Sequence, residues 1–356
     1  MTGRRAPRPR EMAIAQCEMA QEARPMGETD AATAKPGTDD RIRPIVHLKG
    51  ERPPAPDWFN WAIEAPSEEG FVEVAGARIR FSAWGRRGLP GLLFVHGGRA
   101  HRNWWRPFAP FFADRRRVAA LDLSGMGDSD WRERYTMDCV IDELFAVIEG
   151  AGLNDGGGRP MVVGHSFGGW MTLAAVERSG EQLAGAVVID SPISKPDPDE
   201  GYTIMRRRED KADPPSFSRV YGSVEEPVSR FRFLPNQPCE QHYLVDYIAR
   251  EGLTDRPKCG GEGWAWKFDP RHGANFEIHF ERDLFLAARC PLAFLYGKRS
   301  AFAQGEGFDA QKAALRGRAP FITMPAVHHH LMMEEPIAFI TMLRTLLATW
   351  PIRVGA

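Results

Sequence analysis

Short apolar runs recur along most of the chain and alternate with segments in which apolar residues have helical spacing. Val140, Ile141, Leu144 and Val147, for example, would lie on one face of a helix over residues 137–151. Strands that are apolar on both faces are typical of a parallel sheet covered by helices on each side. The pattern therefore predicts an α/β fold with a mostly parallel central sheet. The runs expected to be its buried strands are 91–95, 118–121, 161–163, 183–189, 291–297 and 319–324, followed by a closing helix at 336–349.

A hairpin is expected ahead of these buried strands. Residues 71–74 and 78–84 alternate apolar and polar side chains on either side of Gly76, the pattern of two half-buried strands joined by a tight turn. Residues 104–112, between the first two buried strands, are expected to form a helix.

Two regions break this alternation. Residues 1–55 are rich in proline and charged residues and poor in apolar ones, so we expect a disordered N-terminal extension. Residues 192–285 lie between two core strands and are rich in aromatic residues and arginines. We interpret this segment as a helical lid inserted after the sixth strand; a packed excursion without substrate contact is the alternative. The core is then formed by residues 56–191 and 286–356.

Composition narrows the class of protein. The 356 residues carry a formal net charge of -1, so bulk charge does not favour a nucleic-acid partner. No apolar run approaches the roughly 20 residues of a membrane span. The five cysteines are scattered without a Cys-x-x-Cys pair, which argues against a disulfide framework or a zinc knuckle. We therefore expect a cytoplasmic protein with reduced thiols.

The strand at 161–163 leads into the sequence Gly164-His165-Ser166-Phe167-Gly168, followed by a helix. A sharp strand-to-helix turn exposes a serine hydroxyl and directs backbone N–H groups toward it, which is what a nucleophilic serine requires. An ordinary loop with a chance serine is the alternative. The pattern favours Ser166 as a nucleophile.

Three further motifs accompany this turn in a fixed order. They are His96-Gly97-Gly98 after the first buried strand, the turn at 122–129, and a late histidine followed by Glu-Glu-Pro. With them, residues 68–350 resemble the α/β-hydrolase superfamily of the kind that carries a lid after the sixth strand. The resemblance implies a serine hydrolase whose oxyanion hole uses the backbone N–H groups of Gly98 and Phe167.

The resemblance also requires a general base, and three consecutive histidines compete for that role. In the family, the catalytic histidine follows a proline by four positions and precedes another by seven. Pro325 and Pro336 both select His329 by this rule, leaving His328 and His330 as alternatives. Adjacent side chains diverge and no acidic or cysteine ligand spacing accompanies them, so no metal site is expected.

The acid is where the sequence departs from the family pattern. The commonest position for the carboxylate corresponds to Ser300, which carries no charge. Some branches of the family take the acid from the end of the sixth strand, where Asp190 stands, and we predict that Asp190 completes the triad. Glu306, on a glycine-rich loop, is the weaker candidate. A carboxylate that caps the turn before Pro192 is the alternative reading of Asp190.

These residues together predict a carboxylesterase that cleaves a small to medium apolar ester through an acyl-enzyme, without a metal or organic cofactor. A serine nucleophile argues against epoxide-hydrolase and dehalogenase chemistry, which in this superfamily uses an aspartate at the turn. A lactonase and a carbon–carbon bond hydrolase of ring-cleavage products stay open, the latter because arginines in the lid could bind a substrate carboxylate (Arg206, Arg207, Arg208, Arg230 and Arg232). The alternative outside enzymes is a ligand-binding protein on this fold. A homo-oligomer stays open too.

Overall fold

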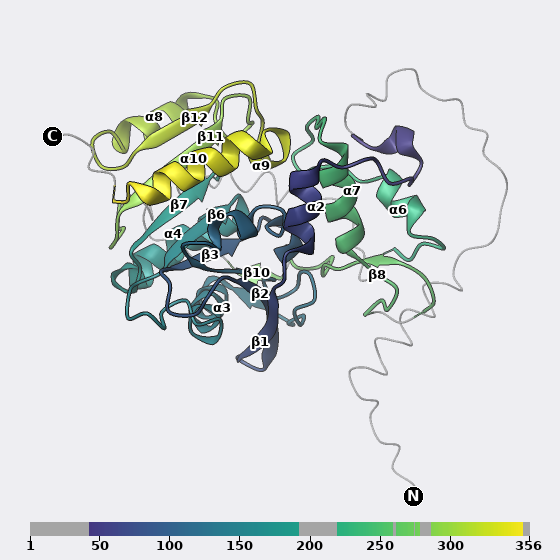
Figure 1. Ribbon diagram of the computed structural model, residues 1–356, viewed down its shortest axis with the longest axis horizontal. Coiled ribbons are helices and arrows are strands. Elements are labelled where there is room, and N and C mark those ends of the chain that lie inside the picture. The colour runs from purple at the N-terminus through teal and green to yellow at the C-terminus, as the bar shows by residue number, and fades with distance from the viewer. Residues whose placement is uncertain (1–42, 192–218, 259–260, 274, 278–285, 352–356) are drawn as a thin grey trace, which may run out of the picture.

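A central eight-stranded sheet organises the computed structural model, which describes residues 43–191, 219–258, 261–273, 275–277 and 286–351 (Figure 1). Its strand order is β1-β2-β4-β3-β6-β7-β11-β12. The β1–β2 and β2–β4 pairs are antiparallel and all other neighbours are parallel, so the predicted α/β fold with a mostly parallel sheet is confirmed. The strands are β1 (Glu68–Val74), β2 (Ala77–Trp84), β3 (Gly91–Val95), β4 (Arg117–Leu121), β6 (Met161–His165), β7 (Gly185–Ile189), β11 (Leu292–Gly297) and β12 (Phe321–Met324).

Helices cover both faces of this sheet, which explains why its inner strands are apolar throughout. In β3, Leu93 and Val95 pack into one hydrophobic cluster, whereas Leu92 and Phe94 pack into a second one on the opposite face. Helices α3 and α4 contribute to the first cluster, and α2, α7, α9 and α10 to the second. Their bounds are α2 (Asp57–Glu64), α3 (Met137–Gly150), α4 (Phe167–Ser179), α7 (His242–Glu251), α9 (Leu331–Glu334) and α10 (Pro336–Ala348). No helix in the described ranges has the length and apolar character needed to cross a bilayer.

The helix predicted at residues 104–112 is absent, and this prediction was wrong. Two short 3-10 helices stand there instead, η3 (Arg102–Trp104) and η4 (Ala109–Phe112). Pro107 and Pro110 lack the backbone N–H that a continuous α-helix would use, and a proline ring clashes with the preceding turn. The apolar spacing of this stretch reflects packing of separate turns against the sheet.

The predicted start of order at residue 56 was also too late. Residues 43–55 are part of the described structure and include the 3-10 helix η2 (Val46–Leu48). Ile45 is only 1% exposed and packs into the second hydrophobic cluster, and the carbonyl of Gly50 accepts a hydrogen bond from Arg250. Ile45, with Leu48 and Ala55 packed against the same cluster, and the long-range bond from Arg250 anchor this stretch. Residues 1–42 lie outside the described ranges.

The described residues of the segment between β7 and β11 form two helices, α6 (Glu225–Ser229) and α7, and three two-residue strands, β8 (Leu253–Thr254), β9 (Ala265–Trp266) and β10 (Phe276–Glu277). In this segment, α7 lies beside α2 and α6 lies on the same side, whereas β10 lies close to the central sheet (Figure 1). Strand β10 pairs with β5 (Tyr135–Thr136), so the segment is tied to the core. Its action as a lid stays a prediction, and residues 192–218, with Arg206, Arg207 and Arg208, lie outside the described ranges.

Candidate active site

Ser166 lies at the sharp turn between β6 and α4, with φ 53° and ψ −121°. Non-glycine residues avoid positive φ because their Cβ atom meets the backbone, and such strain is typical of functional sites. Two glycines make the turn sterically feasible. A Cβ on Gly164 would lie 2.3 Å from the Gly168 carbonyl, and a Cβ on Gly168 would lie 2.4 Å from the His96 carbonyl. The close approach of β6, α4 and the His96 loop thus presents Ser166 at the carboxyl edge of the sheet.

His329 lies on the loop between β12 and α9, with its ring directed at this serine. Its Nε2 atom is 2.9 Å from Ser166 Oγ, and the side chain is 1% exposed. His165 Nε2 donates a hydrogen bond of 3.0 Å to the His329 carbonyl and so fixes the loop. The two neighbouring histidines bond elsewhere: His328 Nδ1 lies 3.0 Å from Glu334 Oε2, and His330 Nδ1 donates to Gln237 Oε1. Of the three, His329 is the one whose ring nitrogen meets Ser166.

Asp190 lies directly after β7 and is completely buried. His329 Nδ1 donates to its Oδ1 atom over 2.8 Å, and the Gly297 N–H donates to Oδ2 over 2.7 Å. The Ser300 hydroxyl donates to the same Oδ1 atom as His329. Ser300 therefore does not stand in for the missing acid; it binds the carboxylate that comes from the neighbouring strand. Glu306 is exposed at the start of α8 (Glu306–Ala314) and makes no hydrogen bond or ion pair with His329 in the described ranges.

Burial is the largest influence on the pKa values of His329 and Asp190. It lowers the pKa of His329, which favours the neutral imidazole whose Nε2 lone pair points at Ser166. Burial also raises the pKa of Asp190, and the hydrogen bonds from Ser300 and Gly297 offset part of that increase because they stabilise the carboxylate. A neutral base next to a hydroxyl is the state needed to accept a proton.

The backbone N–H groups of Gly98 and Phe167 lie on adjoining segments beside Ser166. A Cβ on Gly98 would be 3.8 Å from Phe167 Cβ, so the loop after β3 touches the first residue of α4. Neither N–H has an acceptor among the residues that the structure describes. His96 orients this loop: its Nδ1 donates to the Gly97 carbonyl over 2.7 Å, and its Nε2 accepts from the Leu123 N–H over 3.1 Å. An unused donor at the start of α4 and a second one on the adjoining loop after β3 can together bind an oxyanion.

A cavity of about 390 Å³ adjoins these residues and includes Gly98 and His330 in its wall. This volume falls within the roughly 300–1,000 Å³ typical of small-molecule sites. Aromatic side chains of the segment between β7 and β11 line it, as does Trp104, which sequence reasoning had assigned only to a helix. The aromatic residues of that segment that line the cavity are Tyr221, Phe231, Phe233, Trp266 and Phe268.

The histidine group His165, His329 and His330 also has the composition of a metal site. Each residue offers a ring nitrogen within 4.8 Å of the others, and all three are buried. However, a metal ion on His329 would compete with Asp190 and Ser166 for its two nitrogens. Metal coordination and the Ser166–His329 hydrogen bond are therefore alternatives at this position.

Buried neutral histidines should make the fold sensitive to acid. Burial lowers the pKa of His101 to about 4 and of His165 and His272 to about 3, whereas the unfolded chain titrates near the ordinary value of 6.5. As pH falls below that value, the unfolded state takes up these protons and the folded state does not. Each histidine then lowers the free energy of unfolding by about 1.4 kcal/mol per pH unit. Asp190, whose pKa is raised, contributes in the opposite direction.

We expect urea unfolding monitored by tryptophan fluorescence to show a falling free energy of unfolding between about pH 7 and about pH 4. His272 packs against the rings of Tyr135, Phe167 and Phe276 and its Nε2 has no partner in the described ranges. The His272→Phe variant should therefore fold and show a shallower pH dependence. An unchanged slope in this variant would contradict the assignment.

Comparison with known proteins identifies the family of this chain. A model of the alpha/beta hydrolase family matches residues 92–341, and the chain belongs to that family. "Epoxide hydrolase 4" of Mus musculus is 30% identical over 34% of this chain and 33% of its own length. "Lipase LipV" of Mycobacterium tuberculosis is 32% identical over 33% of this chain and 42% of its own length.

Among solved structures, E-2-(acetamidomethylene)succinate hydrolase superposes with a TM-score of 0.64 at 19% identity, covering 80% of this chain and 100% of that one. This likeness concerns the fold. The chain spans about a third of the length of the first curated relatives it matches. The family assignment places the chain in the alpha/beta hydrolase family, and it leaves the activity and the bond that is cleaved to be inferred from the site.

Proposed function

We propose that the protein is a serine hydrolase that cleaves carboxylic esters through an acyl-enzyme. One observation carries the proposal: a continuous hydrogen-bonded chain of Asp190, His329 and Ser166, with links of 2.8 and 2.9 Å, that ends at a serine on a strained turn. A serine hydroxyl becomes a nucleophile when a positioned base accepts its proton.

In the proposed reaction, Ser166 Oγ attacks the ester carbonyl while His329 Nε2 takes the hydroxyl proton. The Gly98 and Phe167 N–H groups bind the oxyanion that develops, and one such donor contributes about 10²–10³-fold in rate. Asp190 stabilises the imidazolium, which then protonates the departing alcohol. Water, deprotonated by His329, releases the acid and restores Ser166.

The serine at position 166 supports an ester substrate over the alternatives suggested by some relatives. Epoxide hydrolases and dehalogenases of this superfamily use an aspartate at the corresponding turn, whereas this chain has Ser166 there. A lactonase would use the same residues on a cyclic ester. A protein that keeps the fold for ligand binding alone would not need an aligned base.

A carbon–carbon bond hydrolase is the second candidate. It is favoured by Arg230 and Arg232, which line the cavity and could bind the carboxylate of a ring-cleavage product. Such an enzyme would turn over a vinylogous diketone acid and hydrolyse simple aryl esters poorly. Parallel assays of both substrate types with the same preparation would separate the two candidates.

Labelling with a fluorophosphonate probe tests the proposed nucleophile directly. We expect the folded protein to react stoichiometrically, with the adduct mapped by mass spectrometry to the peptide containing Ser166. As the probe reacts, turnover of p-nitrophenyl acetate and butyrate should fall to zero in proportion to the labelled fraction. A well-folded protein that neither reacts with the probe nor hydrolyses these esters would overturn the proposal and favour a ligand-binding role.

A further inference from the structure

We infer that the substrate carries a carboxylate, which Arg232 binds with the help of neighbouring cations in the cavity beside Gly98. This inference rests on the proposed serine hydrolase and specifies its substrate class. It also changes one expectation drawn from sequence: the substrate is amphipathic, with an anionic end and an apolar body, and not simply apolar.

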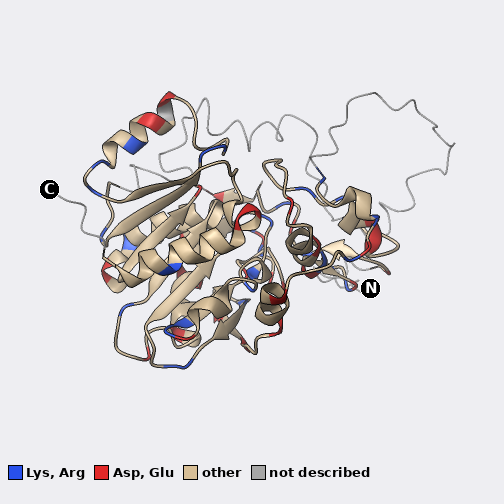
Figure 2. Cartoon of the chain, turned by 45° about the horizontal axis from the view of Figure 1, so that its top comes forward, with Lys and Arg blue, Asp and Glu red and all other residues tan. Residues whose placement is uncertain are grey.

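The charge of the cavity wall is the first observation. Its lining includes five cationic residues and no aspartate or glutamate among the residues described: Arg43, Arg99, Arg230, Arg232 and Lys267. The chain as a whole carries a formal net charge of -1, and Figure 2 shows basic and acidic residues mixed over the elements in view. The cavity thus concentrates positive charge on a molecule that is otherwise balanced, and low-dielectric walls strengthen its attraction for an anion.

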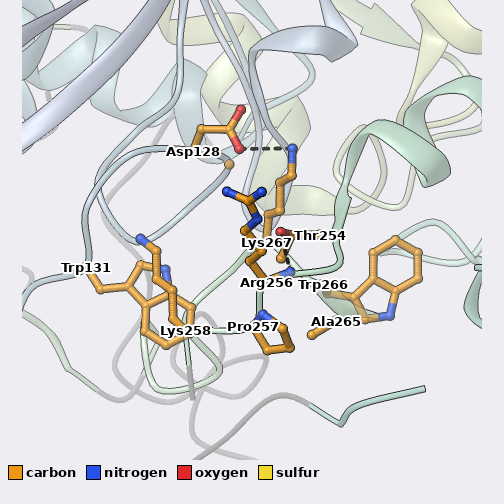
Figure 3. A pocket seen from close by; sticks show the side chains of 10 residues that line it. Asp128, Trp131, Thr254, Arg256, Pro257, Lys258, Ala265, Trp266 and Lys267 are labelled. Carbon is orange, nitrogen blue, oxygen red and sulfur yellow. Dashed lines mark hydrogen bonds and ion pairs between the residues drawn. The ribbon is translucent and has the colours of Figure 1, made fainter. Parts of the chain in front are cut away.

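Lys267 and Arg230 are paired with carboxylates, and the guanidinium of Arg99 lies 5.2 Å from the centre of the Phe268 ring. The ammonium of Lys267 lies 2.9 Å from Asp128 Oδ1 (Figure 3), and Arg230 lies 3.4 Å from Glu226 Oε1 in a half-exposed pair. Arg232 has no carboxylate within ion-pair distance in the described ranges. Its positive charge is therefore the clearest one to be balanced by a bound ligand.

The surroundings of Arg232 are suited to a carboxylate joined to an apolar group. Arg232 is flanked in sequence by Phe231 and Phe233, which line the same cavity and whose rings are 5.4 Å apart, and the ring of Phe231 lies 6.1 Å from that of Trp266. A guanidinium binds a carboxylate with two parallel hydrogen bonds, and its weak hydration makes this possible near aromatic surfaces. The apolar part of such a ligand would contact these rings.

The same cavity adjoins the proposed reaction centre. Gly98 forms part of its wall, and so does His330, whose ring lies 4.6 Å from that of His329. An ester whose carbonyl oxygen is bound by the Gly98 N–H can therefore extend its carboxylate into the basic part of the cavity.

A smaller hollow of about 140 Å³ lies next to this cavity and shares Trp266 and Lys267 with it (Figure 3). Arg256 and Lys258 also line it, but the hollow contains the carboxylate of Asp128, and Lys258 donates to the Ser129 carbonyl. It is the less favourable place for a substrate carboxylate. Exposed Arg256 lies in the same inserted segment and outside the cavity wall, which makes Arg256→Gln a matched control for Arg232→Gln.

The test compares substrates that differ only in charge. One pair is the mono-p-nitrophenyl ester of adipic acid and the same compound with its free carboxyl methylated, which places the charge in the acyl part. The second pair is para-acetoxybenzoic acid and its methyl ester, which places the charge in the alcohol part. We expect kcat/KM to favour the charged member of at least one pair, with KM for that member rising as sodium chloride is added.

The Arg232→Gln variant should lower this preference by roughly tenfold or more, the range for a hydrogen-bonded charge pair, and Arg256→Gln should leave it unchanged. An active wild type without preference in either pair, or a preference lost in Arg256→Gln and kept in Arg232→Gln, would overturn the inference while the proposed function stands. Absence of all ester turnover together with absence of fluorophosphonate labelling would overturn both.

Discussion

The Ser166→Ala protein should fold like the wild type and lose ester hydrolysis almost completely, with kcat reduced by about 10⁶-fold, as expected when the nucleophile of such a triad is removed. The hydroxyl of Ser166 bonds to His329 and supports no other residue through its side chain in the described ranges. Alanine has the same Cβ atom, so the strained backbone at φ 53° is preserved at similar cost. Ester turnover, probe labelling and thermal unfolding should be measured on the same preparation.

Ser191→Ala is the matched control for this variant. The Ser191 hydroxyl donates to the carbonyl of Ser166 over 2.7 Å, so its loss removes a support of the turn and leaves the nucleophile in place. We expect a modest loss of stability or rate, with labelling retained. If the Ser166→Ala protein kept most of its ester turnover, or failed to fold where the control folded, Ser166 would have a structural role.

Much of the fold could be predicted because local sequence and tertiary structure agree in the sheet. Residues 91–95 are apolar at every position, and the structure buries all five because helices cover both faces of β3. The turn at Ser166 could be predicted for a similar reason. Its glycines are required by contacts between segments adjacent in sequence, β6 and α4, and by the nearby loop after β3.

The role of Ser300 could not be predicted from the sequence. Its place in the chain indicated only that the usual acid was missing. Its hydrogen bond to Asp190 depends on the pairing of β7 with β11, two strands separated by the whole inserted segment. The surroundings of Arg232 likewise depend on residues far apart in the sequence, because the cavity wall combines residues from the N-terminal stretch, the loop after β3 and the insertion.

Replacing Asp190 with asparagine should lower kcat by roughly 10⁴-fold with a small effect on KM. The carboxylate accepts hydrogen bonds on both oxygens, from His329 and Ser300 on Oδ1 and from the Gly297 N–H on Oδ2. An amide has only one acceptor oxygen. Whichever way it is oriented, its NH₂ group meets an N–H donor, either that of the imidazole in its productive tautomer or that of Gly297. The imidazolium formed in the reaction also loses its counter-charge. Steady-state kinetics with a p-nitrophenyl ester would measure the effect.

The Ser300→Ala variant keeps the carboxylate of Asp190 and removes the hydroxyl that donates a hydrogen bond to it. Asp190 keeps its bonds to His329 and Gly297 in this variant, so kcat near neutral pH should fall by roughly tenfold, the low end for one hydrogen bond to a charged group and far less than in Asp190→Asn. The Ser300 hydroxyl lowers the pKa of Asp190, and its removal should raise that pKa. Because catalysis needs the ionised carboxylate, activity should then be lost at a higher pH than in wild type as the solution is acidified. A larger loss for Ser300→Ala than for Asp190→Asn would show that the acid is not Asp190. A small loss of kcat, together with a shift of the acid side of the pH–activity profile to higher pH, would instead show that Asp190 is the acid and that Ser300 lowers its pKa.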